Sequence, residues 1–250
     1  MANNFFRTSN PILRGNPFAT TDTSQGTMTL NGTIHKTGIL FLLLVAGASW
    51  TWHIAGTDGM DAAMPWMFGG LIGGLVLALA TCFVKTWAPA TAPVYAVLEG
   101  FALGGISAYL NESYAGIASQ AVAATFCVFL VMLALYSTGI VRATPLFVRG
   151  VIAATGAVAI LYLVNLVMGM FGHSIGIIDS SSPMGIAFSG FVVILAAFNL
   201  ILDFAAIEAG AEAGAPKYME WFGAFSLIVT LVWLYIEVLR LLAKTRGRRN

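Results

Sequence analysis

Three carboxylic acids, Glu99, Asp203 and Glu237, lie inside long apolar stretches of the sequence, and Asn199 lies one helical turn before Asp203. A charge at the centre of a bilayer costs at least about 2.5 kcal/mol, so each acid should face the interior of a helical bundle or water. Desolvation favours the neutral form of a carboxyl group, and a second carboxyl nearby favours it further. Two such groups sharing a proton would form a pH-sensitive element. The predicted chemistry is therefore reversible protonation of carboxyl groups inside the membrane.

Each acid also has a structural interpretation. Glu99 is either a neutral hydrogen-bonding strut between helices or, with Asn199, part of a permeation path. Glu237 is either a proton sensor or the ion-pair partner of Arg240, three residues later on the same helix face. The polar stripe that Asn199 makes with Asp203 favours a functional role for Asp203.

The composition indicates an integral membrane protein. Of 250 residues, 58% are hydrophobic and only 9% are charged, whereas a soluble domain carries about 25% charged residues. The net charge of +1 gives no reason to expect a nucleic-acid partner. Cys82 and Cys127 both fall in apolar runs, which excludes a disulfide framework or a cysteine-based zinc site, and the sequence defines no other metal site.

Seven apolar runs are each long enough to span a bilayer, and helices are expected because lipid offers no partners for backbone groups. The runs are roughly Thr37–Ala55, Met64–Val84, Pro93–Leu110, Ala118–Val141, Val148–Gly172, Pro183–Ile207 and Trp221–Ala243. We expect an all-α, seven-helix transmembrane domain over residues 37–243, after a flexible polar tail (1–36) and before a short basic tail (244–250).

Lysine and arginine positions predict the orientation. The amino-terminal tail and the second, fourth and sixth loops carry Lys or Arg, whereas the first, third and fifth carry none. The amino terminus is therefore predicted to be cytoplasmic. Seven crossings then place the carboxyl terminus outside, although it holds the densest basic cluster of the chain. A re-entrant last segment is the alternative.

Several stretches resemble the Bax inhibitor-1 (TMBIM) family. They are Leu98-Glu-Gly-Phe-Ala-Leu-Gly104, Leu202-Asp203, Leu234-Tyr-Ile-Glu-Val-Leu-Arg-Leu-Leu242 and, for the bacterial Bax inhibitor-like branch, Glu212-Ala-Gly-Ala-Pro-Lys-Tyr-Met-Glu-Trp221. The resemblance implies a bundle with a central last helix that acts as a pH-dependent calcium leak in a bacterial inner membrane. It also implies an acidic pair on the sixth and seventh helices and a basic latch residue on the second. By motif these are Asp203, Glu237 and Lys85, with calcium as the permeant ion and no cofactor.

The chain departs from that pattern at the last helix. Its acid is Glu rather than Asp, the basic residue is Lys rather than Arg, and the segment between the acids is long. Glu237 lies about 30 Å along a helix beyond Lys217, at a different depth from Asp203 unless 205–224 projects as a hairpin or the helix breaks. Three acids in this region, Glu208, Glu212 and Glu220, are expected on a solvated hairpin or, alternatively, at a cytoplasmic cation funnel.

The same sequence argues against two other classes of membrane protein. The last helix has no lysine before Lys244 for a retinal Schiff base, and neither Ser107 nor Ser189 lies in a Gly-x-Ser-Gly motif, so no enzyme is expected. A proton-coupled secondary transporter for cations or small solutes is the alternative function. The small-residue pairs Gly69/Gly73, Gly70/Gly74 and Gly100/Gly104 favour close packing within the chain over a dimer interface, so we expect a monomer in the lipid bilayer. Protein partners are not predicted.

Overall fold

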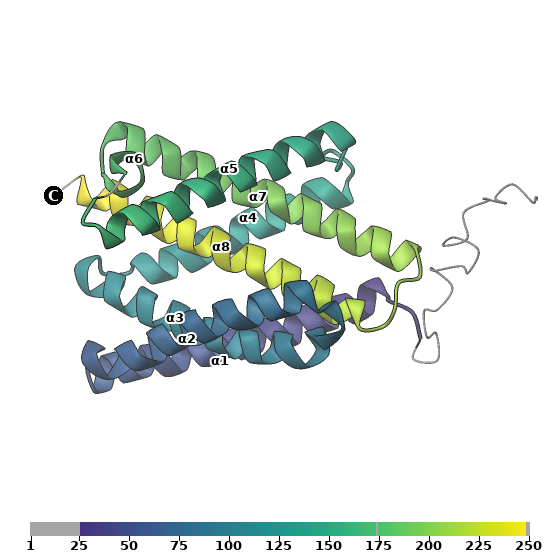
Figure 1. The fold of residues 1–250 in the computed structure, drawn as a ribbon, viewed down its shortest axis with the longest axis horizontal. Helices are drawn as coiled ribbons and strands as arrows, with labels where there is room; N and C mark the ends of the chain where they lie inside the picture. The colour runs from purple at the N-terminus through teal and green to yellow at the C-terminus, as the bar shows by residue number, and fades with distance from the viewer. Residues whose placement is uncertain (1–25, 174, 249–250) are drawn as a thin grey trace, which may run out of the picture.

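The computed structural model describes residues 26–173 and 175–248, and these form a bundle of long helices (Figure 1). Seven helices are long and apolar enough to cross a membrane: α1 (Leu30–Thr57), α2 (Met60–Phe83), α3 (Ala88–Ser113), α4 (Ile117–Ser137), α5 (Pro145–Met170), α7 (Pro183–Glu212) and α8 (Met219–Gly247). Two short helices, η3 (Lys85–Trp87) and α6 (Gly176–Asp179), lie in connections. The predicted all-α seven-helix class is confirmed.

Helices α1 and α8 extend beyond the apolar runs that predicted them, at their starts and at their ends. Helix α1 begins at Leu30, because the Thr29 side chain caps it by accepting a hydrogen bond from Gly32 N at 3.0 Å. The end of the predicted amino-terminal tail is therefore helical, and α8 likewise continues to Gly247 within the predicted basic tail. Residues 1–25 and 249–250 lie outside the described residues.

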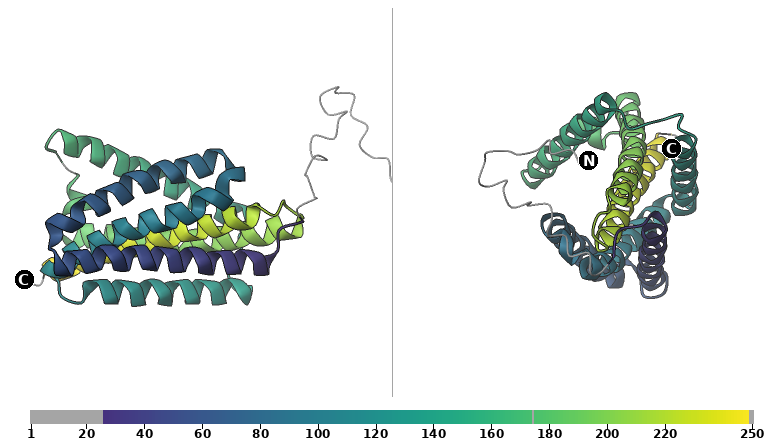
Figure 2. Two further views of the ribbon diagram at one scale, coloured as in Figure 1. Left: turned by 90° about the horizontal axis from the view of Figure 1, so that it is seen from below. Right: turned by 90° about the vertical axis from the view of Figure 1, so that its right-hand side faces the viewer.

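Helix α8 is the central element, as the resemblance implies. Its residues enter both larger hydrophobic clusters, with Leu234 and Leu239 in one and Phe225 and Ile228 in the other. The end-on view shows α8 among the other helices (Figure 2, right). The helix is unbroken, and its two ends lie at opposite ends of the bundle, with its start beside the start of α1 (Figure 1). It is therefore a full-length helix and not a re-entrant segment.

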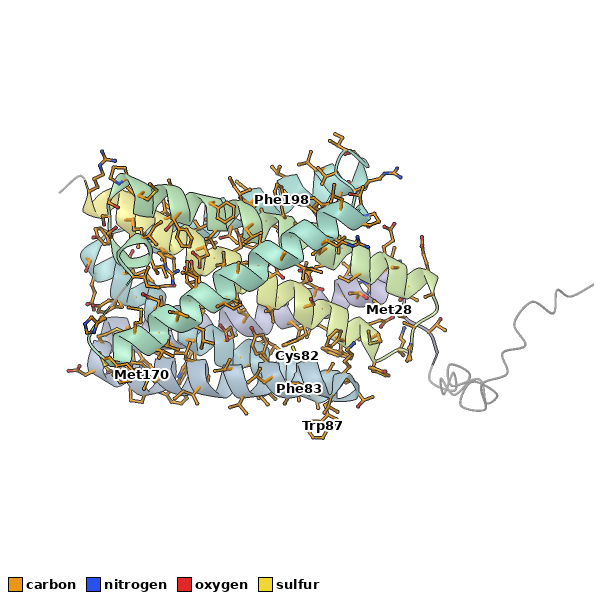
Figure 3. All side chains as sticks on the ribbon, turned by 45° about the horizontal axis from the view of Figure 1, so that its top comes forward. Met28, Cys82, Phe83, Trp87, Met170 and Phe198 are labelled. Carbon is orange, nitrogen blue, oxygen red and sulfur yellow. The ribbon has the colours of Figure 1, made fainter. Side chains whose placement is uncertain are left out.

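Glycines allow α1, α2 and α3 to pack closely. A Cβ on Gly100 would collide with the backbone of Leu44 on α1, and one on Gly70 would lie 2.8 Å from Ala102 N on α3. The small-residue packing predicted for Gly100 and Gly104 is thus found within the chain, whereas Gly69 has no atom within 4 Å of a Cβ and does not take part. The outer surfaces of these helices carry large apolar side chains, and Trp87 projects from the bundle at the α2–α3 connection (Figure 3).

Two neighbouring glycines of α2 provide a matched test of this packing. Gly70→Ala should destabilise the protein by about 1–3 kcal/mol, because the added methyl group overpacks a helix contact with no free space. Gly69→Ala, which has no atom within 4 Å of the new Cβ, should not destabilise it. Thermal unfolding of the two variants in the same detergent checks this, and equal unfolding temperatures would contradict it.

Candidate functional site

Polar side chains form a line between α5, α7 and α8, which we call the polar seam. It comprises Thr155 and Tyr162 of α5, Ser189, Asn199 and Asp203 of α7, and Ser226, Glu237, Arg240 and Lys244 of α8. The last three α8 residues are spaced by three and four positions, which places them on one helix face. The seam extends along most of α8 and is the candidate site.

Asp203 joins α7 to α8 at the end of the bundle where α1 begins. Its Oδ1 accepts a hydrogen bond from Ser226 Oγ at 2.6 Å. Its Oδ2 is buried and forms no hydrogen bond among the described residues, although the side chain of Thr230, one turn after Ser226 on α8, also interacts with this carboxyl group. A buried polar atom without a partner is costly in a stable fold. The Oδ2 position is therefore where a proton, a water molecule or a cation would interact with this carboxyl group.

Asn199 does not contact Asp203 but joins α7 to α5. Its Nδ2 donates to Thr155 Oγ1 and to the Leu195 carbonyl oxygen, both at 2.9 Å. These contacts are typical of a polar residue that holds two membrane helices together. Asn199 thus belongs to the polar seam. Apart from this membership, none of its contacts supports its predicted place in a permeation path.

Glu237 forms an ion pair with Arg240 in the other half of α8. The two side chains approach to 3.2 Å, and Tyr162 OH donates to Glu237 Oε2 at 3.1 Å. The guanidinium group also lies 4.8 Å from the Tyr162 ring centroid. Only 1% of Glu237 is exposed, so its charge is compensated inside the bundle. This is the structural arrangement that the sequence left open for Glu237.

Asp203 and Glu237 are not brought together. Ser226, the α8 contact of Asp203, precedes Glu237 by eleven residues, or about 16 Å along the helix axis. Helix α8 is unbroken, and although α7 continues to Glu212 before the chain turns back into α8 at Met219, Asp203 lies opposite Ser226 and not opposite Glu237. The direct acidic pair implied by the resemblance is therefore not formed between these two residues, and a serine faces Asp203 from α8.

Lys85 lies near Asp203 along the bundle but does not bind it. Its Nζ is 5.3 Å from the centroid of the Phe222 ring on α8. Phe222 precedes Ser226 by one helical turn. Lys85 therefore contacts the central helix one turn before Ser226, the α8 partner of Asp203. The resemblance implies a basic latch residue in this region.

Lys244 is a seam residue that the sequence analysis assigned to a tail. It is 94% buried, and its Nζ donates to Ser189 Oγ at 2.9 Å and to the Gly185 carbonyl oxygen at 3.2 Å. The sequence did contain a sign of this position. Lys244 lies four residues after Arg240 and seven after Glu237, and residues at these spacings lie on one helix face. The ammonium group ties the end of α8 to the start of α7.

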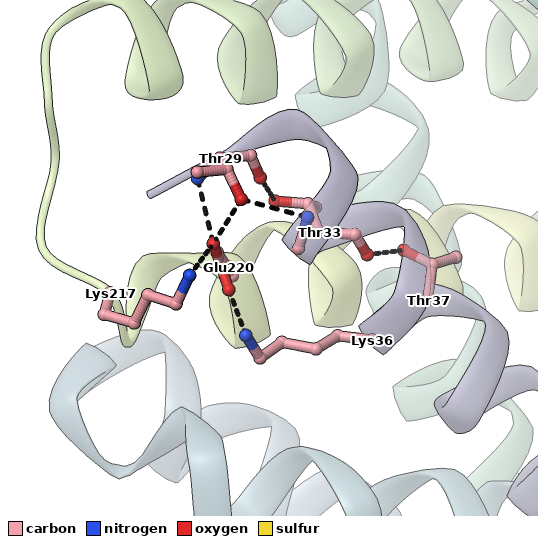
Figure 4. Close-up of polar contacts among 7 residues, drawn as sticks. Thr29, Thr33, Lys36, Thr37, Lys217 and Glu220 are labelled. Atoms are coloured by element: carbon pink, nitrogen blue, oxygen red, sulfur yellow. Dashed lines mark hydrogen bonds and ion pairs between the residues drawn. The ribbon is translucent and has the colours of Figure 1, made fainter. Parts of the chain in front are cut away.

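A second polar cluster lies at the other end of α8, and it corrects the expectation that Glu220 is solvated. Glu220 is fully buried and forms ion pairs with Lys36 and, at 2.8 Å, with Lys217 (Figure 4). Thr29 donates to Glu220 Oε1 through its backbone N at 2.9 Å and its hydroxyl at 2.8 Å. We call these four residues the Glu220 clasp, because it fastens the start of α1 to the start of α8.

The other two acids of this region lie in a cleft between the end of α7 and the α4–α5 connection. The cleft holds about 480 Å³ and is lined by Glu208, Glu212 and Arg142 among others. Glu208 accepts a hydrogen bond from Tyr136 OH. Glu212 is exposed, which agrees with the expected solvated hairpin at this position.

Glu99 lies away from the seam, between α2 and α3. A Cβ on Gly74 would be 2.7 Å from Glu99 Oε2, so the carboxyl group packs against the glycine surface of α2. This position is not beside Asp203. No hydrogen bond of Glu99 is found among the described residues, so its role as a hydrogen-bonding strut stays a prediction.

We therefore expect Glu99→Gln, which keeps the size and hydrogen-bonding capacity of the side chain, to leave both the unfolding temperature and ion flux close to wild type. The measurement is flux into proteoliposomes together with thermal unfolding. Loss of flux at normal stability would show that Glu99 belongs to the permeation path.

The fold and the seam define a class: a multi-pass membrane protein of seven helices with ionisable groups packed around its last helix. A family model described as Bax inhibitor 1 like matches residues 10–247, and the chain belongs to this family. No curated protein and no solved structure matches the chain significantly.

Proposed function

We propose that this protein is a pH-sensitive calcium leak of the Bax inhibitor-1 type, controlled by the protonation of Asp203. One observation carries the proposal: Asp203 bridges α7 to the central helix through a hydrogen bond to one carboxyl oxygen, while the other oxygen is buried and accepts no hydrogen bond within the part of the chain that the structure describes. Family membership supports the leak function. The proposal involves no enzymatic step and no cofactor, and it places a monomer in a bacterial inner membrane with the start of α1 in the cytoplasm.

The charge state of Asp203 decides the strength of the α7–α8 contact. A hydrogen bond to an ionised carboxylate contributes about 1.5–3 kcal/mol, whereas one between neutral groups contributes about 0.5–1.5 kcal/mol. Protonation therefore weakens the Ser226 contact and favours separation of α7 from α8. Lys85 of η3 contacts Phe222, one turn before Ser226 on α8, and is the basic residue that we assign to the closed latch. The leak should open as the pH falls.

The cleft between α7 and the α4–α5 connection supplies an approach for cations. Glu208 and Glu212 follow Asp203 on α7, and both line the cleft. Carboxylates at a pore mouth raise the local concentration of cations, and carboxylate oxygens are the ligands that calcium prefers. In the proposed orientation this cleft faces the cytoplasm.

The test is calcium flux into proteoliposomes of the purified protein as the pH is varied. We expect flux to rise on acidification and to follow the calcium gradient without any counter-substrate. Flux that is absent, or equal at all pH values, would refute the proposal. Flux that is stimulated by substrate on the opposite side would instead support a proton-coupled secondary transporter.

A further inference from the structure

We propose that the groove between α1 and α4 binds a lipid-soluble molecule made of one hydrocarbon chain and one neutral hydrogen-bonding group. The groove is lined by α1, α3, α4 and α8 and has a volume of about 260 Å³. It lies on the side of α8 that Leu231, Val232 and Tyr235 present, within helices long and apolar enough to cross the membrane. The inference is independent of the proposed calcium leak.

The shape of the groove suits a single chain. On α1 its lining extends from Phe41 to Ser49, or about 12 Å along the helix. A volume of about 260 Å³ over this length makes the groove small and elongated, which suits one extended chain. Binding sites for drug-sized molecules are larger, at about 300–1000 Å³.

The groove is open to the bilayer. Val45 on α1 and Val122 on α4 line it and are 41% and 45% exposed. The two helices are bridged there by the ring contact of Phe41 with Phe126, whose centroids are 5.3 Å apart. Because the surrounding solvent at this surface is lipid, a ligand enters sideways from the hydrocarbon phase and is itself largely apolar.

One polar atom in the lining lacks a partner. Thr125 is 93% buried, and its Oγ1 has no hydrogen-bond partner among the described residues. Threonine in a membrane helix usually donates to the carbonyl oxygen one turn earlier, as Thr81 does here at 2.7 Å to Leu77. The other buried hydroxyl of the lining, that of Tyr235, is occupied by Ser107 at 2.8 Å. A ligand with a hydroxyl, carbonyl or protonated carboxyl group would satisfy Thr125.

The experiment uses a photoactivatable octanol, a short chain with one hydroxyl group, and the purified protein in lipid nanodiscs. After irradiation, labelled positions are mapped by mass spectrometry. We expect labels to concentrate in 41–49, 122–126 and 228–235, and unlabelled octanol to compete better than octane. Thr125→Val should reduce labelling by about two- to tenfold, which is the value of one hydrogen bond.

A matched pair of variants controls for the fold. Val122→Trp should fill the groove and remove the labelling. Val131→Trp is the same change at an exposed position on the opposite face of α4, and it should leave the labelling unchanged. Labels spread evenly over lipid-exposed positions, or unchanged by Thr125→Val, would overturn the proposal. If Val122→Trp does not fold, the Thr125→Val result and the competition by octanol decide the question alone.

Discussion

Asp203→Asn is expected to abolish most of the pH dependence of calcium flux while the protein stays folded. Asparagine has nearly the same shape, and its carbonyl oxygen can still accept the hydrogen bond from Ser226 Oγ. It has no titratable proton, so the α7–α8 contact should have the strength of a neutral hydrogen bond at every pH. Flux should therefore stay near the acid level of the wild type across about pH 5 to 8. Proteoliposome flux, with thermal unfolding as a check on the fold, measures this.

Glu237→Gln is the matched control for that experiment. If the two acids titrated as a coupled pair, removal of one would shift the midpoint of the other. They are separated along α8 by about 16 Å, and Glu237 is compensated by Arg240 at 3.2 Å. We therefore expect Glu237→Gln to leave the pH midpoint of flux unchanged and to lower stability. Wild-type pH behaviour in Asp203→Asn, or a shifted midpoint in Glu237→Gln, would contradict the assignment of control to Asp203.

The number and type of the helices could be predicted from the sequence because a bilayer leaves few choices. Backbone groups in lipid must bond within their own segment, and each apolar run was long enough to cross. The helix ends were less predictable. Helix α1 starts at Leu30, before its apolar run, because Thr29 caps it and Glu220 holds Thr29 in place. Such ends depend on polar contacts that hydropathy does not encode.

The candidate site was predictable by residue type but not by pairing. Apolar surroundings identified Asp203 and Glu237 as interior acids, and both are in the seam. Which residue faces Asp203 depends on the relative depth and rotation of α7 and α8, which tertiary packing sets. The number of residues between Lys217 and Glu237 predicted that Asp203 and Glu237 lie at different depths. It did not identify Ser226 as the partner of Asp203. The burial of Glu220 could not be predicted because it lies in the connection between the last two apolar runs, whereas its partner Lys36 is 184 residues away.

The Glu220 clasp leads to a large expected effect on stability. Glu220→Gln removes a fully buried charge that pairs with Lys36 and Lys217. Removal of one member of a buried ion pair costs about 3–5 kcal/mol when the remaining charge stays buried. Here the side chains of Lys36 and Lys217 are 16% and 44% exposed and can turn toward water, so we expect a loss of about 1–3 kcal/mol.

The loss should be local to the joint between α1 and α8. Glu220 also accepts from Thr29, next to the backbone hydrogen bond from Met28 N to Ala215 O at 2.7 Å. Hydrogen exchange should therefore rise in 26–36 and 213–220 and not around Asp203. Glu212→Gln, at an exposed acid of the same region, should change neither exchange nor unfolding temperature.

A second variant approaches the same clasp from the opposite helix. A Cβ at Gly32 would collide with the Glu220 carboxylate, so Gly32→Ala should displace the acid without removing its charge. Because the charge then remains but loses its hydrogen-bonding geometry, this variant should destabilise the joint at least as much as Glu220→Gln. Wild-type exchange in both variants would mean that the lysines and Glu220 contribute nothing to the connection, and that α1 and α8 are held together by their apolar contacts alone.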